Sequence, residues 1–143
     1  MNVKQISVFL ENKPGRLTGL TRALSDAGIN IRALSLADTT DFGIMRLIVD
    51  RPEEALKALQ GQGYSVAETD VLAVGIPDRP GGLAQAAETI SAVGINIEYM
   101  YAFVEKKGGN AVMVFRVDDL EATARALSAA GIPVLPPEDV YNL

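Results

Sequence analysis

The sequence lacks cysteine, histidine and tryptophan entirely among its 143 residues. Without cysteine it can form no disulfide framework and offers no thiolate nucleophile. Without histidine it cannot build the commonest zinc sites, a cysteine–histidine pair or a serine–histidine triad. Chemistry based on carboxylates alone, such as magnesium sites and acid–base pairs, is compatible with both absences.

Basic residues and long apolar runs are also scarce. Lys and Arg number 13 against 18 Asp and Glu, which gives a formal net charge of −5. This balance argues against a nucleic-acid partner, because phosphate binding depends on clustered basic groups. No apolar stretch approaches the ~20 residues that cross a bilayer, and residues 1–5 lead into a strand pattern with no apolar signal core. We therefore expect a soluble cytoplasmic protein with no membrane association and no cofactor.

The chain contains two copies of one unit. Residues 12–17, Asn-Lys-Pro-Gly-Arg-Leu, are matched by residues 78–83, Asp-Arg-Pro-Gly-Gly-Leu, at an offset of 66, and Gly-Ile-Asn-Ile at 28–31 recurs at 94–97. Later matches, such as Met45 with Met113, have an offset of 68, because residues 106–110 form a longer turn. The repeat predicts two domains, residues 1–68 and 69–143.

Hydrophobic periodicity changes in the same order within each copy. Ile6, Val8 and Leu10 alternate as in a strand, and Pro-Gly then opens a helix. The expected apolar positions of these helices are Leu17, Leu20, Leu24 and Ala27 in the first copy and Leu83, Ala87, Ile90 and Val93 in the second. Each copy continues with a second strand and a hairpin, which is expected around residues 41–43 or 108–109. A third strand, a short helix and a last strand follow, and the last strand begins near Tyr64 or Val134. The pattern predicts an α+β fold of two tandem ferredoxin-like βαββαβ modules, antiparallel sheets with helices on one face.

The join between the copies is short. Only residues 67–70 separate Val66 from Val71, and they include no Gly or Pro. A unit of this size has a small core. Both facts favour modules that pack against each other, with a homodimer as a possible further assembly.

The Pro-Gly-x-Leu after the first strand, the Gly-Ile-Asn-Ile at the second and the βαββαβ order resemble the ACT domain. Both copies carry these motifs, so the resemblance covers nearly the whole chain. It implies a stand-alone tandem ACT protein that binds a free amino acid between adjacent modules and regulates an enzyme of amino-acid metabolism allosterically. The site would combine the first strand-to-helix loop with the start of the second strand.

The chemistry of that loop independently suits an amino acid. The exposed N–H groups of a helix start favour a carboxylate, and Asn12, Asn30, Asp78 and Asn96 could accept hydrogen bonds from an ammonium. Glycine allows a ligand to approach the backbone. The candidate ligand-binding residues are Asn12, Pro14, Gly15, Arg16, Leu17, Asn30, Ile31, Asp78, Gly81, Gly82, Leu83, Asn96 and Ile97.

Several of these residues have a simpler structural explanation. The first polar residue of each loop, Asn12 or Asp78, could organise the turn or cap the helix, and the loop glycines could serve backbone geometry alone. Asn30 and Asn96 could satisfy a strand end, while Leu17 and Leu83 could belong to the core. Differences between the copies, such as Asn12 against Asp78 and Arg16 against Gly82, predict two unequal half-sites. The stripe of Tyr99, Tyr101 and Phe103 in the second copy is expected to pack the sheet or the module interface.

Other functions fit the sequence less well. An acylphosphatase-type enzyme would need Arg16 near Asn30 in a wider glycine-rich loop, and adjacent carboxylates such as Glu53 and Glu54 indicate a helix start rather than a catalytic pair. An RNA-binding module would carry aromatic residues on its third strand. The remaining alternative is a docking subunit that binds an enzyme but no ligand; the small subunits of acetolactate synthase are partial analogues. We predict no catalytic residues and no metal site.

Overall fold

The computed structural model describes residues 2–38 and 41–143, without the side chain of Asp38, and these form two compact units. The first unit is Lys4–Thr69, and the second is Asp70–Leu143 with Asn2 and Val3. None of the helices in the described ranges is long and apolar enough to span a membrane.

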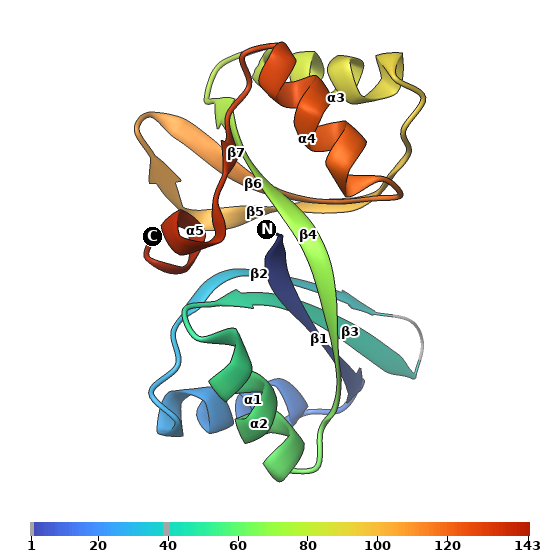
Figure 1. The fold of residues 1–143 in the computed structure, drawn as a ribbon. Coiled ribbons are helices and arrows are strands. Elements are labelled where there is room, and N and C mark those ends of the chain that lie inside the picture. Colours follow the sequence, from blue (N-terminus) through green and yellow to red (C-terminus); the bar gives the residue numbers. More distant parts are fainter. Residues whose placement is uncertain (1, 39–40) are drawn as a thin grey trace. The chain divides into compact units, whose positions relative to one another are not determined.

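The first unit has the element order βαββαβ. Its elements are β1 (Val3–Glu11), α1 (Arg16–Asp26), β2 (Ile31–Asp38), β3 (Phe42–Val49), α2 (Pro52–Gly61) and the beginning of β4 (Ser65–Pro77). Strand β3 pairs antiparallel with β1 and β2, and β1 also pairs with β4. Helices α1 and α2 lie on one face of this sheet (Figure 1).

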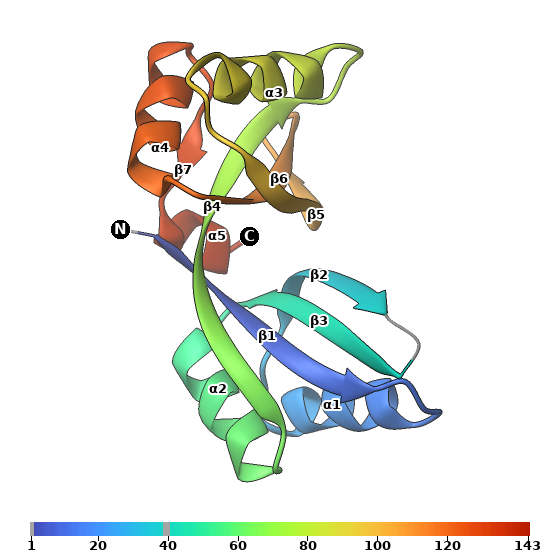
Figure 2. The ribbon, with the colours of Figure 1, turned by 90° about the vertical axis from the view of Figure 1, so that its right-hand side faces the viewer.

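The second unit repeats this order. After β4 come α3 (Gly82–Ala92), β5 (Ile97–Lys107), β6 (Asn110–Val117), α4 (Leu120–Ala129), β7 (Val134–Leu135) and α5 (Pro137–Tyr141). Strand β6 pairs antiparallel with β4 and β5, and β4 pairs antiparallel with β7. Helices α3 and α4 again lie together on one face (Figure 2). The predicted α+β class with antiparallel pairing is confirmed.

Strand β4 differs from the prediction of two strands separated by residues 67–70. It is one continuous strand of 13 residues that ends the first unit and begins the second (Figure 1). The residues at the join include no glycine or proline, so nothing in them interrupts the extended backbone. A further difference is α5, which was not predicted although Pro137 and two acidic residues mark its first turn. The first hairpin was predicted around residues 41–43, but Phe42 and Gly43 already belong to β3. Residues 39 and 40 lie outside the described residues, as does Met1.

Each unit has a core between its helices and one sheet face. In the first unit the alternating strand residues predicted to face inward, Ile6, Val8 and Leu10, pack with Leu20, Leu24 and Leu59. The second core contains Leu72, Val74, Ile76, Ala86, Ile90 and Leu127. The predicted helix start at Glu53 and Glu54 is also confirmed, because both lie in the first turn of α2. Another acidic residue, Asp119, caps α4.

The predicted helix faces were wrong at their ends. Leu17 and Leu83 are each 43% exposed and Val93 is 53% exposed, while Ala27 is exposed beyond the end of α1. Leu17 and Leu83 lie in the first turns and Ala27 and Val93 at the C-terminal caps, whereas the helix residues that pack in the cores come from between these ends. In α3, Ala86 rather than Ala87 is fully buried. The core explanation for Leu17 and Leu83 is therefore wrong.

Candidate functional site

The loop that enters each first helix depends on a glycine with a left-handed backbone. Gly15 and Gly81 precede α1 and α3 and both have φ 87°. A residue with a Cβ is strained in this region. No heavy atom lies within 4 Å of the position a Cβ would take at either glycine. The left-handed backbone is by itself sufficient to require glycine at both positions, and the approach of a ligand there stays a prediction.

Neither helix start is capped by a side chain. No side-chain hydrogen bond caps α1 or α3, so the helix-capping explanation for Asn12 and Asp78 is wrong. The backbone N–H of Asn12 instead donates to the Asp41 carbonyl at 2.9 Å, which fixes the loop against the start of β3. The first-turn N–H groups of Leu17 and Thr18 have no partner within the helix. This leaves donors directed out of the helix beside an open surface.

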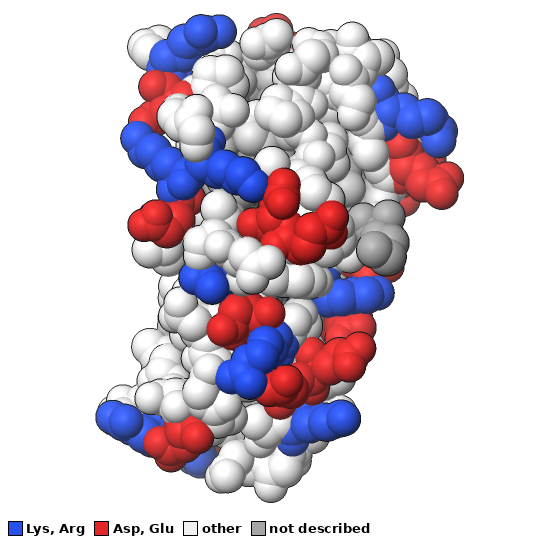
Figure 3. Space-filling model, turned by 60° about the vertical axis from the view of Figure 1, so that its left-hand side comes forward, with Lys and Arg blue, Asp and Glu red and all other residues white. Residues whose placement is uncertain are grey.

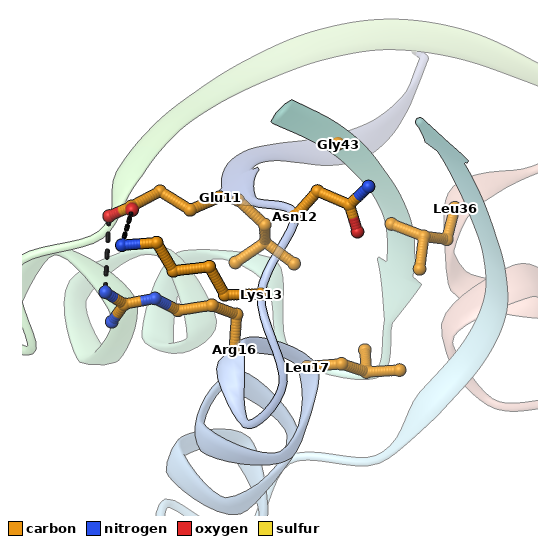
Figure 4. A pocket seen from close by; sticks show the side chains of 8 residues that line it. Glu11, Asn12, Lys13, Arg16, Leu17, Leu36 and Gly43 are labelled. Carbon is orange, nitrogen blue, oxygen red and sulfur yellow. Dashed lines mark hydrogen bonds and ion pairs between the residues drawn. The ribbon is translucent and has the colours of Figure 1, made fainter. Parts of the chain in front are cut away.

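A hollow of ≈ 280 Å³ lies at this helix start in the first unit. It is lined by Leu10, Glu11, Asn12, Lys13, Arg16, Leu17, Leu36 and Gly43. Figure 4 shows Asn12, Leu17 and Leu36 on one side of the loop and the heads of Glu11, Lys13 and Arg16 on the other. We call this space the first loop hollow. It combines an amide, apolar walls and unpaired backbone donors.

A three-residue charge cluster borders the first loop hollow. Glu11 lies 2.8 Å from the Lys13 ammonium and 3.2 Å from the Arg16 guanidinium. The hydrogen bond from Lys13 and the positive charges of Lys13 and Arg16 hold the pKa of the Glu11 carboxyl below its ordinary value. With two cations and one anion, the cluster keeps one positive charge near the helix start.

The second unit has an equivalent hollow of ≈ 370 Å³. We call it the second loop hollow; it is lined by Ile76, Pro77, Asp78, Arg79, Pro80, Leu83, Ala111 and Met113. Each matches a residue of β1, α1, β3 or their loop at an offset of 66 or 68. Here Asp78 pairs with the ammonium of Lys106, which stands at the start of the longer second hairpin. The predicted ammonium acceptor of this half-site is thus already paired within the chain.

The second copy has Gly82 at the position where the first copy has Arg16, and this difference has a steric cause. A Cβ on Gly82 would lie 2.2 Å from the backbone carbonyl oxygen of Pro77. In the first unit the corresponding pair is Arg16 and Glu11, which form an ion pair. A side chain at this position of the second unit, charged or not, would therefore clash with the backbone unless the backbone moved.

The start of the second strand is not near the helix start within a unit. Asn30 and Ile31 line a separate hollow with Leu24, Ser25 and Gly28, at the other end of α1. The 11 residues of α1 correspond to about 16 Å of helix. Asn30 exchanges backbone contacts with Asp50, donating to its carboxylate at 3.0 Å and accepting from its N–H at 3.1 Å. The structure thus does not bring Arg16 to Asn30, as an acylphosphatase-type site would require.

The corresponding residues of the second unit follow the same plan. Asn96 is exposed after α3, and Ile97 begins β5 and packs against the second core. The first-unit counterpart, Ile31, packs against the first core in the same way. These two isoleucines therefore have a structural role whether or not a ligand contacts them.

Comparison with known proteins identifies the family. Residues 1–135 match the family described as an ACT domain pair. The chain belongs to this family. An aspartokinase of Corynebacterium glutamicum is 34% identical over 134 residues, which covers 82% of this chain and 31% of that protein. The ACT pair thus spans about a third of the length of the curated relatives it matches.

Solved structures agree with this assignment. A protein of Bacteroides thetaiotaomicron is 40% identical with a TM-score of 0.93, covering 100% of this chain and 98% of that one. The regulatory subunit of aspartate kinase from Thermus thermophilus, in a ligand-free form, has a TM-score of 0.66 at 21% identity, covering 91% of this chain and 93% of that one. At that identity the second likeness concerns the fold of the ACT pair alone.

Sequence reasoning missed several residues of the loop hollows. Leu36 and Gly43 reach the first from β2 and β3, and Lys106 reaches Asp78 from β5. The predicted pairing of β2 with β3 across a hairpin was the sequence signal that could have placed Leu36 beside the first loop hollow. In the aromatic stripe, Tyr101 and Phe103 are buried, at 9% and 8% exposed, and Tyr99 is half-buried, which is compatible with the predicted packing role. On the face of the ACT pair in Figure 3, acidic and basic groups are interspersed rather than gathered by sign, and no three acidic side chains of the described residues form a metal site.

Proposed function

We propose that this ACT pair is a regulatory protein that binds a free amino acid at its loop hollows and thereby modulates an enzyme of amino-acid metabolism. The family supports a regulatory role, and the relatives named aspartokinase motivate the class of partner enzyme. The observation that carries the proposal is the pair of equivalent hollows, each at an uncapped helix start.

The first loop hollow offers a partner for each part of an amino acid. The N–H groups of Leu17 and Thr18 and the helix dipole suit the carboxylate, and the positive charge of the neighbouring cluster adds to this preference. The carbonyl oxygen of Asn12 can accept from the ammonium. The side chains of Leu17 and Leu36 favour an apolar or small ligand side chain.

The two loop hollows are unequal, and we propose that the first binds the ligand. In the second, the Asp78 carboxylate is engaged by the protein's own Lys106 ammonium. A ligand ammonium would have to displace that contact, which costs part of what it gains. Any contribution of Asn30 or Asn96 to a bound ligand has to come from a different module or a second copy of the chain, because within a unit they lie at the far end of the helix.

A thermal-shift screen against the twenty amino acids tests the proposal. A ligand at 100 times its dissociation constant adds about 2.7 kcal/mol, which raises the melting temperature by several degrees. We expect a selective shift with one or two amino acids. If no amino acid shifts the transition at millimolar concentration, the proposal fails and a docking subunit that binds only an enzyme becomes the better explanation.

Leu17→Asp identifies the hollow without disturbing the fold. An acidic residue in the first turn of α1 favours the helix, but its charge repels a ligand carboxylate at the same N–H groups. Leu83→Asp is the matched control in the second loop hollow, and Leu17→Asn separates charge from loss of the apolar wall. We expect Leu17→Asp to abolish the shift with unchanged far-UV circular dichroism, and Leu83→Asp to retain it. Substitution of Gly15 is unsuitable because its φ of 87° makes any side chain strained.

A further inference from the structure

The first unit contains another hollow, which shares Leu10, Glu11 and Arg16 with the first loop hollow. Its volume is ≈ 380 Å³, within the range of small-molecule pockets. Its walls include Phe9, Phe42, Tyr64 and Ser65, together with Glu11 and Arg16. We call it the aromatic hollow. The heads of Glu11 and Arg16 point away from Asn12 (Figure 4), and both residues line the aromatic hollow.

Two of its aromatic rings are unusually exposed. Phe9 is 50% exposed and Phe42 is 57% exposed. Phe9 pairs with Ile44 and Glu11 with Phe42 across β1 and β3. Both rings therefore lie on the sheet face opposite α1 and α2. Neighbouring exposed rings beside a hollow indicate a binding surface more strongly than isolated apolar residues do.

The second unit shows that the fold does not require this hollow. At the corresponding positions it has Gly75 for Phe9, Asn110 for Phe42 and Pro133 for Ser65. A Cβ on Gly75 would lie 3.0 Å from Pro133 Cγ and 3.4 Å from Asn110 Nδ2. The Gly75 N–H also donates to the Pro133 carbonyl at 2.9 Å. The second unit thus packs this space closed, whereas the first leaves it open and lines it with aromatic rings.

The chemistry of the walls indicates the ligand class. Phenylalanine rings favour an aromatic partner in offset or edge-to-face contact. The Arg16 guanidinium offers planar donors suited to a carboxylate, and its Nη2 donates to a Glu11 carboxylate oxygen at 3.2 Å. Since Lys13 also neutralises Glu11, an added carboxylate meets a net positive cluster.

We propose that the aromatic hollow binds an aromatic carboxylate, with its ring against Phe9 and Phe42 and its carboxylate at Arg16. This site is separate from the amino-acid site, because it needs no ammonium acceptor and uses neither Asn12 nor Leu17. Phe42 lines the aromatic hollow but not the first loop hollow, and Leu17 lines the first loop hollow but not the aromatic hollow. The two proposals can therefore fail independently.

Three probes that differ in their head group test the charge requirement. Phenylacetate, phenylacetamide and phenethylamine are titrated into the full chain and followed by ¹H–¹⁵N correlation spectra. We expect phenylacetate to bind most tightly and to shift the amide signals of Phe9, Phe42 and Ser65. Arg16→Gln should reduce the affinity for phenylacetate to that for phenylacetamide.

Phe42→Asn tests the aromatic wall with the residue that the second unit carries at the same place. Loss of the ring contact should weaken phenylacetate binding about three- to tenfold, while Leu17→Asn should leave it unchanged. Equal affinity for the three probes, or signal changes confined to other residues, would overturn the proposal. It would also be overturned if no probe bound and Phe42→Asn dissociated a dimer in sedimentation velocity, since the rings would then form a contact between copies.

Discussion

Replacement of Gly82 by alanine should destabilise the second unit. The added Cβ would lie 2.2 Å from the Pro77 carbonyl oxygen, whereas ordinary van der Waals contact begins at 3.4 Å. The helix start or the end of β4 must therefore move by roughly an ångström, and overpacking of this kind costs about 1–3 kcal/mol. The better helix propensity of alanine offsets up to about 1 kcal/mol of this cost. We expect a net loss of about 1–2 kcal/mol.

The matched control is Arg16→Ala at the corresponding position of the first unit. It removes an exposed ion pair with Glu11, worth about 0–1 kcal/mol, and creates no clash. Urea denaturation followed by far-UV circular dichroism measures both variants, and amide hydrogen exchange assigns the change to a unit. If Gly82→Ala is as stable as the parent chain within about 0.5 kcal/mol, the steric explanation for the Arg16-to-Gly82 difference is refuted.

Three further predictions concern the loops and helix starts. Gly15→Ala should lower the free energy of unfolding, measured by urea denaturation, by about 1–2 kcal/mol because φ at Gly15 is 87°. The control is Gly61→Ala, in α2 with no heavy atom near its Cβ position, which should be neutral or stabilising; equal effects of the two variants would contradict the requirement for a left-handed residue. In ¹³C spectra the Glu11 carboxyl should titrate below its ordinary pKa of 4.5, and in Lys13→Met its pKa should move back toward that value; an unchanged midpoint would refute this. The stability contributed by the Glu11–Lys13 pair is therefore present above pH 4.5 and is lost as pH falls through the lowered pKa. Asp119→Ala should cost about 0.5–2 kcal/mol of unfolding free energy, since its side chain accepts from the Ala122 N–H at 3.0 Å, and a change near zero would show that the cap does not stabilise α4.

Much of the fold could be predicted because repetition and alternation are local signals. The alternation of Ile6, Val8 and Leu10 fixes the buried face of β1. The repeated Gly28 and Gly94 have left-handed φ angles of 71° and 75° and follow the ends of α1 and α3. The single strand β4 does not follow from the repeat, which places a boundary between the copies. The absence of Gly and Pro at residues 67–70 is compatible both with a short join between packed modules and with one continuous strand, and β4 shows the continuous strand.

The candidate site was predictable only in part. The loop glycines and helix starts follow from the Pro-Gly motif, since their geometry is set by neighbouring residues. The direction of the Arg16 side chain toward Glu11, the pairing of Asp78 with Lys106 and the clash that excludes a side chain at Gly82 depend on residues from different turns and strands. These contacts decide which half-site is open, and no local pattern encodes them.

Isothermal titration calorimetry of the parent chain and of Leu17→Asp, with the amino acid that gives the largest thermal shift, tests the central claim most directly. We predict saturable binding to the parent chain, loss of that binding in Leu17→Asp and its retention in Leu83→Asp. Saturable binding that survives in both variants would place the ligand outside the loop hollows and contradict the account. So would the absence of binding by any amino acid to the parent chain.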